Sequence, residues 1–434
     1  MRYLALVLLT VILVWTPLPY GSVPPWAGAA LALAISLAAV LAVADGKSAR
    51  TLSALRTVLA ALGGLALLGL AQRLLPALSL APRLSFEAGI AWGAVALLLA
   101  AAAITGGSAR VKGWLLAAAV GAASFQMLYG WRQARTAPGE IWGRVVPGPG
   151  SRLRGSFVNP DHAAMFFTIM LAVCFGWGWW AWRRSRREPV LGRRVSLLVG
   201  PLVMSLVLWA ALLATGSRAG LAAAVIGLVV QAALISVPSG RWWLPLALAL
   251  VLAATGLGLQ RLGATRDLGR QLSTPIYEVA NNPRYAVWAP ALRLWRTAPW
   301  LGTGLGTFGE AYPRVEVGAS TRVRWGRAHN DPLELLVTGG LLAVGLLLLA
   351  VGVLVQRLWR GYRSATGSAS RAACLAAFAA LPPVLFHELF DFGLTVPANA
   401  VLLLVLLGVA AGSPTALEAG AAPLRSPPKR PRPA

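Results

Sequence analysis

The chain has 434 residues, of which 57% are hydrophobic and only 12% are charged, with a formal net charge of +25. Long apolar runs such as 341–355 exclude an ordinary soluble domain and are typical of a helical bundle surrounded by lipid. The cations lie between apolar spans, which argues against nucleic acid as a partner. Membrane lipids with anionic headgroups, or phosphate-bearing ligands, are expected instead.

Hydropathy predicts an all-α, polytopic integral membrane protein with about twelve transmembrane helices in a single domain, 1–412. No small-x-small cleavage site follows the first span, so we expect an uncleaved helix rather than a signal peptide. The basic, proline-rich tail, 413–434, is expected to be disordered. In chain order the predicted spans are 2–16, 26–43, 51–71, 86–104, 113–130, 162–182, 195–214, 220–237, 242–259, 331–356, 372–386 and 396–412.

Alternate short loops set the predicted orientation of these spans. Basic clusters such as 183–194 and 357–371 share one side with the basic tail. The positive-inside rule makes that side cytoplasmic, so both termini are expected in the cytoplasm. The opposite side then receives a smaller loop, 131–161, and a large loop, 260–330.

An excess of arginine on this outer side is the anomaly in the predicted topology. All three lysines, Lys47, Lys112 and Lys429, fall on the cytoplasmic side, whereas every basic residue of the outer loops is arginine. A GC-rich genome explains part of the bias, but not why so many cations lie on the side that the rule depletes. Arginine pairs two-pronged with phosphate oxygens, so we expect an outer phosphate site.

All three histidines, His162, His329 and His387, fall at the outer ends of predicted spans. His329 is the strongest catalytic candidate, because histidine accepts a proton near neutral pH and this one has no obvious structural duty. Asn330 or Asp331 beside it can cap the helix that follows. Further polar residues at this boundary are expected to bind the substrate or a diphosphate: Arg154, Asn159, Arg327, Asn330, Asp331, His387 and Asp391.

Two further arginines are candidate ligands for an anion. Arg218 lies in a tight turn between two spans, where a charge is costly; snorkelling to the interface is its structural alternative. Arg284 lies in a stretch, 284–296, whose aromatic residues and Leu292 share one helical face, as in a helix lying in the outer interface. The glycines of 302–306 suggest N–H groups presented to an anion.

Metal chemistry is not favoured by the sequence. A zinc site from His162, His329, His387 and Asp391 has suitable ligand types, but no two histidines are close in sequence. No Asp-x-Asp pair is present to hold magnesium against a diphosphate. We therefore expect no metal and no cofactor. The two cysteines fall inside apolar spans and are interpreted as small buried hydrophobes.

In this order the motifs resemble the O-antigen ligase and Wzy-type polysaccharide polymerase superfamily. The resemblance implies a GT-C-like, metal-independent, inverting glycosyltransferase of the bacterial inner membrane, which takes a glycan from undecaprenyl diphosphate on the periplasmic face. By motif position Arg218 and Arg284 would bind the diphosphate, and His329 would position or deprotonate the acceptor hydroxyl. The likeness is carried by residues 155–159, 217–220, Arg284 with Trp288, 302–308 and 329–334.

The acceptor and the precise class stay open. The ligase pattern has Thr-Gly shortly after the position of Gly340, where this chain has Ala343-Val344. The acceptor is therefore expected to be lipid A-core or a growing polysaccharide, and an exopolysaccharide or protein-glycan transferase stays open as well. A transporter or flippase of lipid-linked glycans is the alternative of another class. It predicts ionisable residues near the midplane and paired repeats, which the sequence lacks. A membrane scaffold would leave the outer arginines unexplained.

Overall fold

The computed structural model describes residues 1–46, 48–146, 152–236, 243, 250, 283–316, 325–365 and 367–413. Apart from two single residues, the predicted span at 242–259 lies outside this part of the chain. So do the first part of the predicted large loop, 260–282, and the tail from 414.

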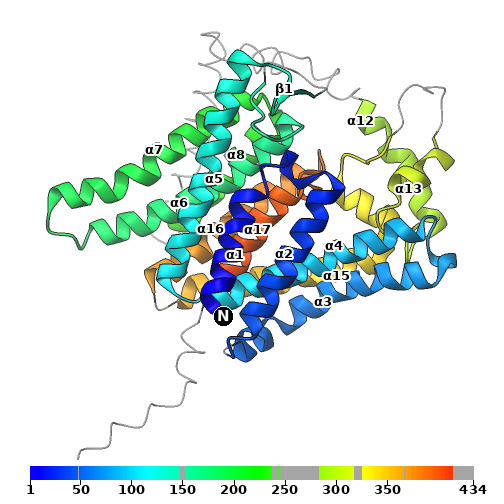
Figure 1. Cartoon of the computed structure of the whole chain (residues 1–434), viewed down its shortest axis with the longest axis horizontal. Coiled ribbons are helices and arrows are strands. Elements are labelled where there is room, and N and C mark those ends of the chain that lie inside the picture. Colours follow the sequence, from blue (N-terminus) through cyan, green and yellow to red (C-terminus); the bar gives the residue numbers. More distant parts are fainter. Residues whose placement is uncertain are drawn as a thin grey trace, which may run out of the picture.

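The described part of the chain is a bundle of apolar helices (Figure 1). Nine of these helices are long and apolar enough to cross a membrane, and two shorter apolar helices accompany them. The protein is therefore a multi-pass, all-α membrane protein, as predicted, and eleven of the predicted spans (nine plus two) coincide with helices. The nine are α2 (Pro25–Val43), α3 (Ala49–Leu74), α4 (Pro82–Thr105), α5 (Ala109–Thr136), α6 (Pro160–Ser185), α7 (Leu191–Thr215), α8 (Arg218–Ser236), α15 (Asp331–Ser364) and α16 (Ser368–Glu388); the shorter two are α1 (Arg2–Trp15) and α17 (Pro397–Ala411).

Short elements fill the connections between these helices. A small hairpin, not predicted, occupies the smaller loop, which begins later than expected because α5 continues to Thr136. The short elements are η1 (Tyr20–Ser22), η2 (Pro76–Leu78), β1 (Glu140–Ile141), β2 (Arg144–Val145), α12 (Pro283–Ala286), α13 (Trp288–Thr297), α14 (Phe308–Ala311), η4 (Tyr312–Arg314) and η5 (Gly393–Thr395).

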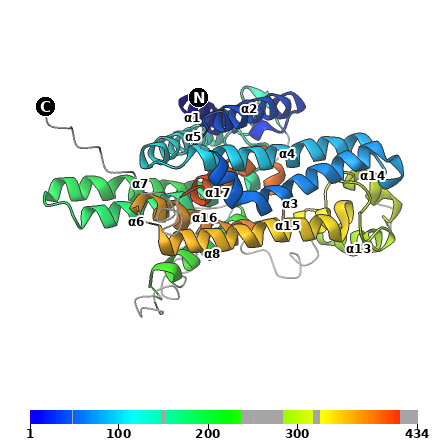
Figure 2. The same cartoon turned by 90° about the horizontal axis from the view of Figure 1, so that it is seen from below.

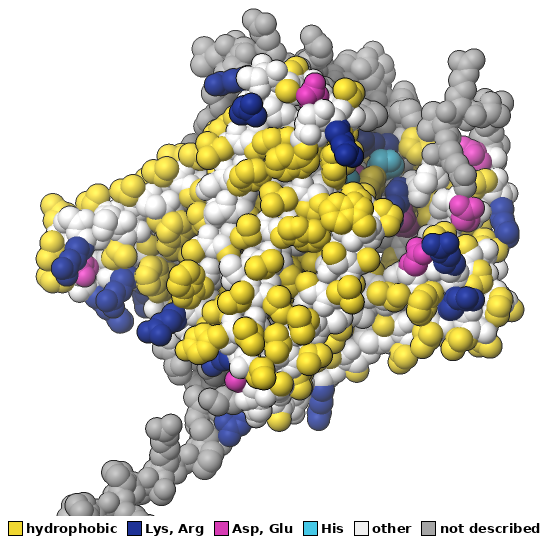
Figure 3. Space-filling view, viewed as in Figure 1, with side chains coloured by type: hydrophobic (Ala, Val, Ile, Leu, Met, Phe, Trp, Pro, Cys, Tyr) yellow, Lys and Arg dark blue, Asp and Glu magenta, His cyan; other side chains and the backbone are white. Residues whose placement is uncertain are grey.

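Helix α6 is the central element of the bundle. It packs on α7, α8, α16 and α17. In its most apolar stretch, 72% of the residues are buried, more than in any other candidate span of the described residues. Helices α3, α4 and α15 run side by side along another part of the bundle, with α13 and α14 at one end (Figure 2). Hydrophobic side chains cover the middle of the face in Figure 3, and charged side chains lie toward its edges.

Helix α15 is interrupted at Gly340, whose backbone has φ 65° and ψ −169°. The preceding loop supplies partners for the backbone groups that the break leaves free. Thr338 O accepts from Gly304 N–H at 2.9 Å. On the other side of the break, Leu341 N–H donates to Pro299 O at 2.9 Å. Such compensation is required where a helix is broken away from water.

These bonds correct the expectation that the glycines of 302–306 offer N–H groups to an anion. Gly302 N–H donates to Ala298 O, and Leu305 N–H donates to the Gln72 side chain at 2.9 Å. A Cβ at Gly302 would lie 2.3 Å from the α15 backbone. The glycines therefore serve close packing of this loop against α3 and α15.

Helix α13 also differs from its sequence-based description. Ala291 and Leu294 form its buried face, and it packs on α15. Leu292, which was expected to share the apolar face, is 41% exposed. The helical periodicity of the apolar residues did not identify the buried face, because contact with the neighbouring α15 determines which side of this short helix is covered.

Candidate active site

Several helix ends and one turn meet at a single end of the bundle. The N-terminal ends of α6, α15 and α17 lie here, together with the C-terminal end of α16 and the turn at 389–396. The buried amide of Asn399 joins them: its Nδ2 donates to His162 O at 3.1 Å and to Gly393 O at 3.0 Å. Side chains that are far apart in sequence are thereby held together.

Asp391 lies at the centre of this arrangement, and its side chain is only 2% exposed. Its Oδ1 is 3.6 Å from His329 Nδ1, and its Oδ2 is 3.9 Å from His162 Nε2. His387 is fully buried and interacts electrostatically with the same carboxylate. All three predicted histidines therefore surround one acid. In the described part of the chain, no group of such side chains is arranged to hold a metal ion.

The environment of Asp391 favours its ionised form. Burial raises the pKa of this carboxyl, but the neighbouring imidazole of His329, followed by His162, His387 and the guanidinium of Arg284, outweighs burial and lowers the pKa to about 2. Asp391 is therefore a carboxylate at any physiological pH. It can hold the His329 ring in place and stabilise positive charge on it.

Aromatic and cationic contacts fix the surroundings of the His329 ring. The Phe392 ring centroid is 4.8 Å from that of His162 and 4.9 Å from that of His329, and both pairs are edge-on. Arg327 lies over Phe392 at 5.7 Å and pairs with Glu334 at 2.7 Å. Phe392, which the sequence analysis did not single out, is thus a spacer that positions two histidines.

The backbone of His329 is held in an uncommon conformation, with φ +50°. Two contacts impose it: Glu334 accepts from Ala328 N–H at 2.9 Å, and Asn330 caps α15 by accepting from Leu333 N–H at 2.9 Å. Strained non-glycine residues of this kind concentrate at functional sites. The side chain is 18% exposed, so His329 is reachable from outside.

Glu388, another residue that the sequence analysis did not select, is buried beside this cluster. Its Oε1 accepts from Leu394 N–H at 3.0 Å, and its carboxyl interacts with that of Asp331. Two carboxyl groups this close and this buried resist simultaneous ionisation. An acid at the end of an apolar helix was the sequence signal that could have found it.

The two arginines that are candidate ligands for an anion, Arg218 and Arg284, lie at the same end of the bundle. Arg284 is within electrostatic range of Asp391. Arg218 is the first residue of α8, in a turn packed on the first turns of α6, where Thr168 Oγ1 donates to Gly220 O at 3.5 Å. A Cβ at Gly220 would lie 2.6 Å from Ala164. The turn that carries Arg218 therefore adjoins the helix end that carries His162.

Some of the polar residues just before α6 have structural roles, and others have hydrogen-bond donors without a partner. Asn159 caps α6 by accepting from Asp161 N–H, and Arg152 pairs with the Asp161 carboxylate at 2.7 Å. Arg154 is 1% exposed, and neither of its Nη atoms has a hydrogen-bond partner in the described part of the chain. Burial lowers the pKa of this guanidinium. Asn159 therefore has a structural role, whereas Arg154 retains unused donors.

Residues 202–349 match the family model described as O-antigen ligase. The match starts within α7, ends within α15, and includes Arg218, Arg284 and His329. It confirms the resemblance that the sequence motifs indicated. No curated protein matches the chain. A multi-pass helical bundle with this match indicates a membrane enzyme of the O-antigen ligase or polymerase type.

Proposed function

We propose that the protein transfers a glycan from undecaprenyl diphosphate to an acceptor hydroxyl at the end of the bundle that carries the histidines. The observation that carries this proposal is the His329–Asp391 pair, 3.6 Å apart, with Arg284 in range of the same carboxylate. A reachable base beside cations suits the transfer of a group from a phosphate ester.

The reaction makes one glycosidic bond and breaks one sugar–phosphate bond. The acceptor oxygen attacks the anomeric carbon from the face opposite the diphosphate, so that configuration inverts. His329 takes the hydroxyl proton, and the bonding electron pair leaves with undecaprenyl diphosphate. Arg218 and Arg284 offset the charge that develops on the departing diphosphate, which needs no metal ion in this scheme.

The roles of the neighbouring groups follow from their contacts. Asp391 orients His329 through Nδ1, which leaves Nε2 to face the acceptor. This role replaces the diphosphate contact expected for Asp391, because a carboxylate repels an anion. The His387 side chain is buried and interacts electrostatically with the same carboxylate. Arg327 and Arg154 remain proposed contacts for the donor.

The orientation of the bundle in the membrane determines whether the site can reach its donor. The histidine end faces the periplasm of a bacterial inner membrane, where the donor glycan is available, and both termini are cytoplasmic. The acceptor is lipid A-core or a growing polysaccharide chain. Purified enzyme offered each acceptor separately distinguishes a ligase from a polymerase.

The test uses purified protein with a glycan on undecaprenyl diphosphate. Arg284→Ala and Arg218→Ala should each lower the transfer rate by about 10²–10³-fold, as loss of a charge-stabilising group does. Arg296→Ala is the matched control, because Arg296 is an exposed arginine of α13. Wild-type rates in both variants, with normal insertion, would overturn the arginine assignment. Lipid translocation without new glycosidic bonds would indicate a transporter instead.

A further inference from the structure

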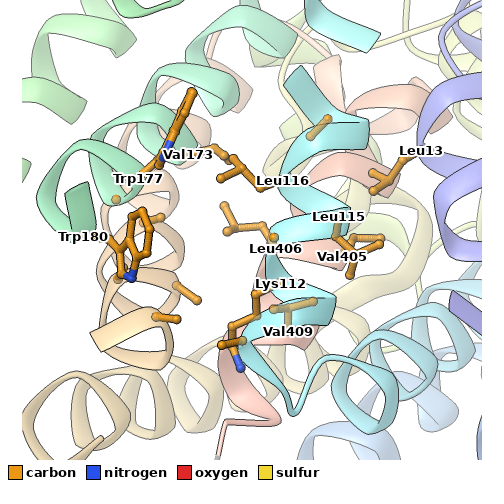
Figure 4. Close-up of a pocket in the computed structure, with 18 of the residues that line it drawn as sticks. Leu13, Lys112, Leu115, Leu116, Val173, Trp177, Trp180, Val405, Leu406 and Val409 are labelled. Carbon is orange, nitrogen blue, oxygen red and sulfur yellow. The ribbon is translucent and has the colours of Figure 1, made fainter. Parts of the chain in front are cut away.

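An apolar cavity of about 220 Å³ lies between α1, α5, α6, α16 and α17 (Figure 4), and none of the three histidines lines it. On α6, the lining residue nearest to His162 is Val173, eleven residues away. At 1.5 Å per residue this separates the two by roughly 16 Å along the helix. On α17 the lining begins at Leu402, three residues after Asn399. The cavity is therefore separate from the histidine cluster and lies mostly toward the end of the bundle that carries Lys112.

The walls of the cavity are almost entirely hydrocarbon. In Figure 4, Trp177 and Trp180 lie on one side and face Leu116 and Leu406, while Lys112 lies at one end. Much of the remaining lining is alanine and glycine, which leaves the space open. Several lining residues, including both tryptophans, are partly exposed, so the cavity reaches the surface. Apolar cavities do not retain water, and in a membrane hydrocarbon is available to fill them.

A cluster of cations lies at the end of the bundle where Lys112 is found. Each cation donates to a backbone carbonyl at the end of α4, α15 or α17, where the helix dipole favours positive charge. Lys112 interacts electrostatically with Arg2, and Cys374 interacts with both Lys112 and Arg357, which places these groups together. The bonds are Arg2 to Thr105 O at 3.1 Å, Lys112 to Gly106 O at 2.8 Å, Arg357 to Ala411 O at 2.6 Å and Arg371 to Ala365 O at 3.1 Å.

Three of these four cations, Arg2, Lys112 and Arg371, have no carboxylate partner in the described part of the chain. The Nε atoms of Arg2 and Arg371 are buried there without a hydrogen-bond partner. Like charges repel one another, so an external anion would stabilise the arrangement.

We propose that the cavity binds an acyl chain of an anionic phospholipid, whose phosphodiester lies against Lys112 and the neighbouring arginines. The apolar slot matches the acyl chain of such a lipid, and the cationic cluster at its end matches the anionic phosphodiester. The lipid belongs to the leaflet on the Lys112 side, which is cytoplasmic in the proposed orientation. A cavity of about 150 Å³ holds a benzene-sized group, so about 220 Å³ takes a segment of one chain rather than a long polyprenyl tail.

Two glycines of α5 provide a cavity-filling variant and its control. Gly113 lines the cavity, and a Cβ there meets nothing within 4 Å, so the leucine of Gly113→Leu has room to begin and should fill part of the slot. Gly121 is exposed on the same helix, outside the lining, and a Cβ there also meets nothing within 4 Å. Lys112→Gln removes the charge but keeps a donor for Gly106 O.

Native mass spectrometry of the full chain with phosphatidylglycerol and phosphatidylcholine tests the proposal. Wild type and Gly121→Leu should retain phosphatidylglycerol, and Gly113→Leu should lose it. Lys112→Gln should reduce the preference for phosphatidylglycerol over phosphatidylcholine about fivefold, the effect of one cation near an anionic lipid. Monodisperse elution checks folding, and Gly113→Leu decides the matter if Lys112→Gln fails to fold.

Three outcomes would overturn the lipid site: equal retention of both phospholipids by wild type, full retention by Gly113→Leu, or preferential displacement of phosphatidylglycerol by undecaprenyl phosphate. Because the readout is binding rather than transfer, the result is independent of the proposed glycosyltransferase activity.

Discussion

Asp391 and His329 define the chemistry at the scale of single residues. Their separation of 3.6 Å, the burial of Asp391 and the left-handed backbone of His329 together bring the ring Nδ1 toward the carboxylate. An acid that orients a base acts on the rate of the chemical step rather than on substrate binding.

Replacing Asp391 by Asn should therefore lower kcat about 10–100-fold and leave KM for the donor nearly unchanged. Glu87→Gln is the control, since Glu87 forms an exposed ion pair with Arg83. The two constants are measured with purified protein and defined substrates. A raised KM with unchanged kcat would show that Asp391 acts in binding and not through His329.

The lowered pKa of Asp391 also predicts a pH dependence of stability. A carboxyl whose pKa is lower in the folded state stabilises the fold fully above its ordinary value of about 4. This contribution is lost as the pH falls through the folded pKa of about 2. The difference in Tm between wild type and Asp391→Asn should therefore shrink as the pH falls from about 5 to 3. A difference that stays the same over this range would contradict the lowered pKa of Asp391.

The site was only partly predictable from the sequence. The histidines and Asp391 were identified because ionisable residues at the ends of apolar spans are rare and costly. Their meeting around one carboxylate depends on the Asn399 bonds between α17, α6 and the 389–396 turn, which no local pattern encodes. Glu388 carries the same sequence signal but was not selected, and its pairing with Asp331 on another helix could not be read from the sequence.

At the scale of elements, the spans were predicted because apolar runs must be helical in lipid. The break in α15 was not predicted, since its partners come from the loop before the helix. The buried face of α13 was predicted wrongly at Leu292, because the packing of this short helix on α15 outweighs its sequence period.

Gly340→Ala should destabilise the protein. Alanine cannot adopt the Gly340 conformation without a strain of about 1–3 kcal/mol, and its Cβ would lie 2.3 Å from Trp300 O. Gly345→Ala is the matched variant on the same helix, where a Cβ meets nothing within 4 Å. It should raise stability by about 0.5–1 kcal/mol. Thermal unfolding in detergent compares the two; equal Tm values would refute a strained break.

At the scale of the whole molecule, the proposal depends on which end faces the periplasm. An alkaline phosphatase reporter inserted near Gly139 should be active, because the β1–β2 hairpin precedes the end of α6 that carries His162. The same reporter inserted at Glu188, between α6 and α7, should be inactive. Activity only at Glu188 would reverse the orientation and remove the donor from reach of the site.

The central claim is glycan transfer that uses His329 as base and arginines in place of a metal. Purified wild-type protein should transfer a glycan from undecaprenyl diphosphate at the same rate with and without excess EDTA. His329→Ala, monodisperse and with wild-type Tm, should lose about 10²–10⁴-fold of that rate, the contribution of a general base. Undiminished transfer by His329→Ala, or loss of wild-type transfer in EDTA that is restored by a divalent cation, would contradict the account.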